Sequence, residues 1–292
     1  MNPFPVRSKT VGKLLSLAIL GSLLPTFWSN CVAAWWLGGH GSLGKFAALI
    51  LGLSLLIFGC TLFKLTYHSE LSSLGISYNL LIKRVLEQKH WWVICLSFLG
   101  IGLMVLLWSG DAPAFLILLI GFFLITYGIL YRASPMAALF IGLARLCVYF
   151  LAASESVRGI SGEVVWKALA IAGYSGGASL AVRGRLRHPF WGPACVLWMS
   201  IPILLALLEA GFRPKTCLLA GLLGFWIWIC CSQLLSKDST HQPYSAADLV
   251  TGTILVDLLA IGGEPFWLAT ILGITMLFMV VLQRKQLVTN HF

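Results

Sequence analysis

Long apolar runs separated by short polar segments dominate the chain from end to end. A run of about 20 apolar residues is long enough to cross a bilayer as a helix. Strands of a membrane barrel alternate apolar and polar residues, and these runs do not alternate. The pattern therefore predicts an all-α, polytopic transmembrane bundle of about nine to ten spans. The expected spans are Lys13–Leu37, Lys45–Tyr67, Trp91–Trp108, Ala112–Tyr131, Pro135–Ala153, Val164–Val182, Phe190–Ala210, Thr216–Leu235, Ala246–Ile261 and Pro265–Leu282.

The polar segments are too short for a separate soluble domain, so residues 1–292 are expected to form a single integral-membrane domain. The longest loop covers residues 68–90 and contains the segment "SYNLLIKRVLEQKH". Its leucines and valine alternate with polar residues at a spacing typical of an amphipathic helix on the membrane surface. Two interpretations stay open for this segment, a plain interfacial helix and a lid over a lateral cavity.

Composition agrees with the hydrophobic pattern. Hydrophobic residues make up 59% of the chain and charged residues 10%, with a mean hydropathy of +0.92. About a quarter of a soluble globular chain is charged. The net charge of +10 is spread over short loops and forms no basic face, so nucleic acid is not an expected partner. The basic residues gather in alternate loops, which predicts a cytoplasmic N-terminus. No convincing small-residue cleavage site follows the N-terminal basic residues, so we expect the first helix to be retained.

The eight cysteines lie mostly inside apolar runs and lack metal-ligand spacing. We expect them to be small buried apolar side chains.

Few polar residues fall within the predicted spans, and an ionisable group in hydrocarbon is a functional candidate by default. Asn30 lies in the first span, Arg145 in the fifth, and Asp257 deep in the ninth. One interpretation pairs Arg145 with Asp257 in a buried structural ion pair. The other has Arg145 bind an anion such as a diphosphate, because a guanidinium donates two parallel hydrogen bonds. Asn30 likewise suits either interhelical bonding or a substrate contact.

Three segments together resemble the UbiA superfamily of intramembrane prenyltransferases. "LPTFWSNCVAAWWLGG" resembles the first helix in some bacterial branches, "MAALFIGLARLCVYFLAAS" is similar to the fifth, and "GTILVDLLAI" to a late helix. They occur in the family's order, and the resemblance covers most of the chain. It implies a helical bundle around a lipid-facing cavity, in a bacterial inner (cytoplasmic) membrane. It also implies transfer of a prenyl chain from a prenyl diphosphate to an acceptor.

The family holds Mg²⁺ with an Asn-Asp-x-x-Asp-x-x-x-Asp motif at the end of its second helix. In this chain "LFKLTYHSEL" occupies that place. Phe63 replaces the asparagine, and Lys64, Tyr67 and Leu71 replace the three aspartates. Glu70 is the nearest carboxylate and the one candidate metal ligand. The Mg²⁺ that the resemblance implies therefore lacks its usual ligands here.

Basic and aromatic side chains offer another way to hold a diphosphate. The segment after the sixth helix, "AVRGRLRHPFWG", contains no acid where many family members have a second aspartate motif. Tyr127 and Arg132 stand roughly where the family has a tyrosine and a basic pair. Ammonium and guanidinium groups at Lys64, Arg132 and 183–187 would stabilise a diphosphate without metal.

Three functional hypotheses follow. The first is a prenyltransferase with a rebuilt diphosphate site. The second is a non-catalytic protein that binds a prenyl lipid or stabilises a partner enzyme in the membrane. The third is a transporter, for which no internal repeat is visible in the sequence. The candidate substrate-binding residues are Asn30, Lys64, Tyr67, Arg132, Arg145 and Asp257.

Overall fold

A computed structural model gives the architecture of the chain. It describes residues 24–71, 90–109, 113–131, 133–184, 186, 188–235, 242–262 and 265–289. For residues 65–71, 90–91, 109, 210, 242–244 and 282–289 it describes the backbone alone.

The described residues form helices and turns and contain no strand, which confirms the all-α prediction. The helices are α2 (Leu24–Leu37), α3 (Leu43–Leu71), α5 (His90–Ser109), α6 (Ala114–Leu130), α7 (Ala137–Ser154), α8 (Gly162–Val182), α9 (Trp191–Ala210), α10 (Pro214–Leu235), α11 (Gln242–Thr251), α12 (Thr253–Ala260) and α13 (Phe266–Thr289).

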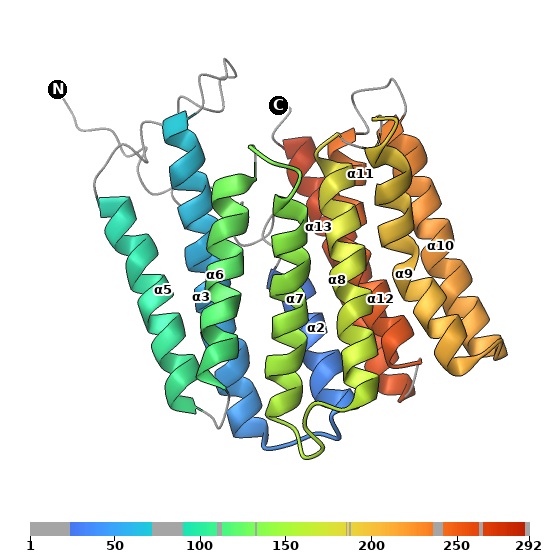
Figure 1. Ribbon diagram of the computed structural model, residues 1–292, viewed down its shortest axis with the longest axis horizontal. Coiled ribbons are helices and arrows are strands. Elements are labelled where there is room, and N and C mark those ends of the chain that lie inside the picture. Colours follow the sequence, from blue (N-terminus) through green and yellow to red (C-terminus); the bar gives the residue numbers. More distant parts are fainter. Residues whose placement is uncertain are drawn as a thin grey trace.

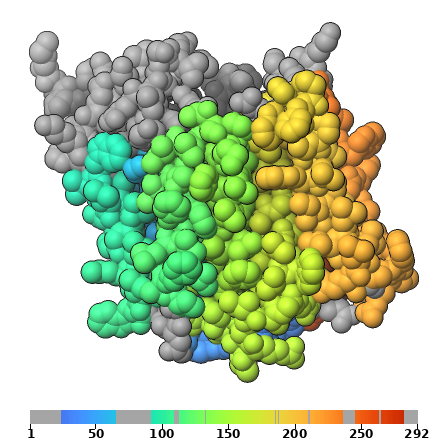
Figure 2. All heavy atoms as spheres, viewed as in Figure 1, coloured from blue at the N-terminus to red at the C-terminus, as the bar shows by residue number. Residues whose placement is uncertain are grey.

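The helices stand side by side and mostly alternate in direction (Figure 1). Helices α3, α5 and α6 form one side of the bundle, and α9 and α10 form the other. Between them α7 packs against α2, α6 and α8, while α12 contacts α2, α8 and α13. Figure 2 shows the face on which α6, α7, α8 and α9 succeed one another across the molecule.

Four described helices have the length and hydropathy of membrane spans. They cover Leu43–Lys64, Ala137–Ser154, Trp191–Glu209 and Pro214–Leu235. Three further apolar segments are shorter, namely Trp92–Trp108, Ala114–Leu130 and Phe266–Val281. Large apolar side chains on these helices face outward, among them Met104, Leu118, Leu197, Trp228 and Leu277. A bilayer accommodates such a surface, whereas water does not.

The ninth predicted span is not one continuous helix. Helix α11 ends at Thr251 and α12 begins at Thr253, with Gly252 between them. Two side chains from other helices bind carbonyls beside the interruption. The Tyr174 hydroxyl donates to the Leu249 carbonyl at 2.8 Å, and the Trp226 indole N–H donates to the Asp248 carbonyl at 3.1 Å. A Cβ at position 252 would lie 2.1 Å from the Tyr174 hydroxyl oxygen, so this geometry requires glycine.

Glycines let α8 approach both of its neighbours closely. A Cβ on Gly142 of α7 would lie 2.7 Å from the Ala172 carbonyl oxygen of α8. A Cβ on Gly177 of α8 would lie 2.7 Å from the Cys195 carbonyl oxygen and 2.9 Å from the Met199 nitrogen of α9. Small residues at helix interfaces gain van der Waals contact in a bilayer, where no hydrophobic force drives the association of helices. This close packing fixes the rotation of α8 about its own axis.

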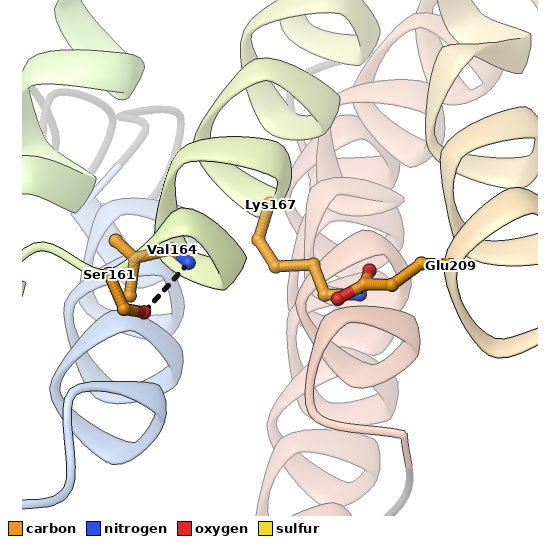
Figure 3. A network of polar contacts seen from close by, with 4 residues as sticks. All are labelled: Ser161, Val164, Lys167 and Glu209. Atoms are coloured by element: carbon orange, nitrogen blue, oxygen red, sulfur yellow. Dashed lines mark hydrogen bonds and ion pairs between the residues drawn. The ribbon is translucent and has the colours of Figure 1, made fainter.

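A cap and an ion pair stabilise the N-terminal part of α8 (Figure 3). The Ser161 hydroxyl accepts a hydrogen bond from the Val164 N–H at 3.3 Å, which satisfies one of the free donors of the first turn. Lys167 reaches across to Glu209 near the end of α9 and forms an ion pair with it. Lys167 is buried and Glu209 is exposed, so this pair joins α8 to α9 at the surface of the bundle.

Gly177→Ala is expected to destabilise the protein by about 1–3 kcal/mol, because the new methyl group meets backbone atoms that cannot move independently. Gly221→Ala on α10 is the matched control, since a Cβ there has no atom within 4 Å. Thermal unfolding in detergent should show a lower midpoint for Gly177→Ala alone. Equal midpoints for the two variants would contradict the tight α8–α9 contact.

Candidate functional site

Asp257 is the centre of a buried polar network between α2, α7 and α12. Its carboxylate is 0% exposed and accepts three hydrogen bonds. Oδ2 accepts from the Ser29 hydroxyl at 2.5 Å and from the Asn30 amide at 2.7 Å. Oδ1 accepts from the Tyr149 hydroxyl at 2.9 Å. These donors replace the water that a carboxylate loses on burial.

Arg145 supplies the positive charge of the same network. Its side chain is 1% exposed and its guanidinium lies 4.4 Å from the centre of the Phe27 ring. One terminal nitrogen donates to Asn30 Oδ1 at 2.6 Å and to the Thr26 carbonyl at 3.3 Å. The other terminal nitrogen donates to the Thr26 hydroxyl at 2.7 Å. Both terminal nitrogens are therefore bound by protein acceptors on α2.

Asn30 bridges the two charged groups, which do not touch each other. Its carbonyl oxygen accepts from Arg145 while its amide donates to Asp257. The network thus carries one positive and one negative formal charge, with an amide between them. This arrangement favours structural roles for Arg145 and Asn30 over direct contact with a substrate. We call the set Thr26, Ser29, Asn30, Arg145, Tyr149 and Asp257 the central lock.

A second cluster lies where α3, α6 and α8 approach one another at one end of the bundle. Lys64 lies in α3, seven residues before the helix ends at Leu71. Its ammonium nitrogen lies 3.3 Å from the centre of the Tyr131 ring and 4.9 Å from that of Tyr127. The Arg183 guanidinium carbon, just past α8, lies 4.7 Å from the same Tyr131 ring. We call Lys64, Tyr127, Tyr131 and Arg183 the basic end cluster.

Arg183 also closes the C-terminal end of α6. Its two terminal nitrogens donate to the carbonyls of Leu130, Tyr131 and Ser134. The last carbonyls of a helix lack partners within the helix and carry partial negative charge, so a guanidinium stabilises them. Arg183 therefore fixes α6 against α8 and keeps its positive charge next to Lys64.

The predicted site residues do not all come together. Asn30, Arg145 and Asp257 belong to the central lock, whereas Lys64 belongs to the basic end cluster. Arg132 and the side chains of Tyr67 and Glu70 lie outside the described residues. The 68–90 loop is described only at residues 68–71, which continue α3, and at residue 90.

The basic end cluster does not fit Mg²⁺. Magnesium requires oxygen ligands, usually carboxylates, and Lys64 places an ammonium where the resemblance expects an aspartate. Among the described residues, no group of three or more His, Cys, Asp or Glu side chains is placed to hold a metal ion. The cysteines are all unbonded thiols, buried except for Cys217.

Thr26 and Tyr131 are members of these clusters that sequence reasoning missed. Thr26 is an ordinary residue near the start of an apolar run, and only the fold shows that both of its oxygens bind Arg145. Tyr131 ends a predicted span and resembles an interfacial aromatic residue. Its spacing of four from Tyr127 places both rings on one face of α6, and this signal could have identified it.

No protein-family model, no curated protein and no solved structure matches this chain.

Arg145→Met should lower the free energy of unfolding by about 3–5 kcal/mol, because it leaves the Asp257 carboxylate buried without a positive charge in its network. The double variant Arg145→Met, Asp257→Leu removes both charges and should be less destabilised than the sum of the single variants. Unfolding of the four proteins in detergent measures this coupling. Additive effects would mean that the two charges do not depend on each other.

Proposed function

We propose that this protein is a UbiA-like intramembrane prenyltransferase that binds its prenyl diphosphate at the basic end cluster. One observation carries the proposal: Lys64 and Arg183 converge on Tyr131 from α3 and α8. Two cations near one ring create a positive potential that attracts an anion with more than one negative charge. Arg183 would act through its charge, because its terminal nitrogens donate to carbonyls at the end of α6. A diphosphate is such an anion.

The position of the cluster suits an amphiphile with a charged head. Lys64 follows the apolar run of α3, and the polar residues Thr66, Tyr67 and His68 come soon after it, so a diphosphate at its ammonium would lie where the apolar part of the helix gives way to a polar segment. The prenyl chain can then run along apolar helix surface within the bilayer. The half-buried tyrosine rings shield the two cations partly from water, which strengthens their interaction with an anion.

The same cations would assist the transfer reaction. When the bond between the prenyl carbon and the diphosphate oxygen breaks, negative charge grows on the departing diphosphate. Lys64 and Arg183 would stabilise this charge, a role that metal ions fill in the family. The prenyl carbon then bonds to the acceptor, which loses a proton. Lys64 occupies the place of the first aspartate of the family motif, so the proposed site coincides with the family's own.

A non-catalytic prenyl-lipid-binding protein is the second candidate. The observation that favours it is the central lock. Arg145 and Asp257 both bind Asn30 there, so neither charged group is directed at a substrate. The two candidates share the diphosphate site. They differ in whether the purified protein transfers the chain.

Lys64→Gln should weaken binding of a long-chain prenyl diphosphate about tenfold or more, because it removes a charge-assisted hydrogen-bond donor. Lys45→Gln is the matched control, since Lys45 is exposed at the opposite end of the same helix. Binding to the purified protein would be measured by titration calorimetry, once with Mg²⁺ and once with a chelator. The proposal expects the wild-type affinity to survive chelation.

Equal affinity of the Lys64 and Lys45 variants would refute the assignment of the site. Chain transfer to a panel of acceptors separates the two candidates. Chelator-resistant transfer that falls in Lys64→Gln supports the enzyme, and tight binding without transfer supports the lipid-binding protein.

A further inference from the structure

Two serines of α8 differ from the other hydroxyl residues within the described helices. Ser54, Thr61, Ser97, Ser200, Thr270 and Thr275 each donate a hydrogen bond to the carbonyl four residues earlier. This local bond satisfies a hydroxyl in an apolar setting. The hydroxyls of Ser175 and Ser179 are buried and form no such bond, nor a hydrogen bond to any neighbouring group. The two residues are 5% and 9% exposed.

The helix geometry places both serines on the face of α8 that continues from Arg183. Positions 175, 179 and 183 are four residues apart, so their side chains follow one another along one face. The neighbouring faces are occupied: Gly176 lies against the Trp198 ring of α9 and the Ala138 carbonyl of α7, and Gly177 lies against α9. Tyr174 points to the Leu249 carbonyl of α11. Ser175 and Ser179 therefore face the interior between α7 and the α11–α12 pair.

Polar groups surround this part of the interior. Ser179 is close enough to Tyr127 of α6 for the two side chains to interact. Arg145 is close enough to Tyr127 and Tyr174 for electrostatic interaction. The polar face of α8 thus extends from the basic end cluster towards the central lock.

We propose that Ser175 and Ser179 bind the hydroxyl-bearing head group of a second ligand, which enters from the basic end cluster. This inference rests on the proposed function, because it places the second ligand beside the diphosphate site. A serine hydroxyl both donates and accepts a hydrogen bond, so its best partner is a group that does the same. An alcohol satisfies both serines.

A prenyl chain is the wrong occupant for this face. Covering a buried hydroxyl with hydrocarbon leaves it unsatisfied, which costs about 1–3 kcal/mol for each group. A helix rises about 5.4 Å in each turn, so Ser175 lies roughly two turns, about 11–12 Å, from Arg183. A diphosphate bound at Arg183 does not extend that far. The two hydroxyls therefore suit a molecule other than the prenyl diphosphate.

Cysteine accessibility tests the inference. Ser179→Cys and Ser175→Cys would be made in a Cys217→Ser background, which removes the one exposed thiol. A small hydrophilic methanethiosulfonate should label both variants, and Ser175→Cys should react more slowly because it lies deeper. Ser200→Cys, a position on α9 whose hydroxyl is bonded to its own helix, is the control and should stay unlabelled in membranes.

Protection by ligands then tests the chemistry. Monoolein, which carries two hydroxyls, should slow labelling of Ser179→Cys several-fold, whereas methyl oleate, which carries none, should not. Failure of the reagent to label either folded variant, or equal protection by both lipids, would overturn the inference. Labelling does not require prenyl diphosphate, so a failed diphosphate titration with successful monoolein protection would reject the proposed function and keep this site.

Discussion

The burial of Asp257 is the constraint on which the rest of the structure depends. A carboxylate without water must find donors and a compensating positive charge, and here both come from two other helices, α2 and α7. Meeting that requirement fixes the rotation of α2, which carries the asparagine bridge, and of α7, which carries the guanidinium. In hydrocarbon, where apolar side chains pack equally well in many arrangements, such a network selects one of them.

Helix α8 connects the packed core to the basic end cluster and fixes the position of Arg183 there. Its glycines bring it close to α7 and α9, and Lys167 holds its first turns to Glu209. At its other end Arg183 binds the last carbonyls of α6. Because α8 cannot rotate freely between these contacts, Arg183 stays beside Tyr131. The cation pair there is consequently a property of the whole bundle and not of one flexible loop.

Hydropathy alone predicted the helices well, and it failed where distant side chains decide the local structure. Ala137–Ser154 and Pro214–Leu235 lie within two residues of their predicted bounds, because length and apolarity determine a span. The interruption at Gly252 depends on Tyr174 and Trp226, which are remote in sequence and carry no signal at the glycine itself. The sequence likewise suggested a pairing of Arg145 and Asp257. The Asn30 amide lies between them because of the way α2 is rotated. Hydrophobic periodicity does not reveal this rotation in a helix that is almost entirely apolar.

The central lock also sets the order in which the chain can mature. Ser29 and Asp257 are 228 residues apart, so nearly the whole polypeptide must leave the ribosome before the lock can close. Until then the Arg145 guanidinium on α7 lacks the counterion that the completed network provides. The last third of the protein therefore completes a polar network whose other members lie in the first half. A chain that ended before α12 would leave Arg145 without its counterion.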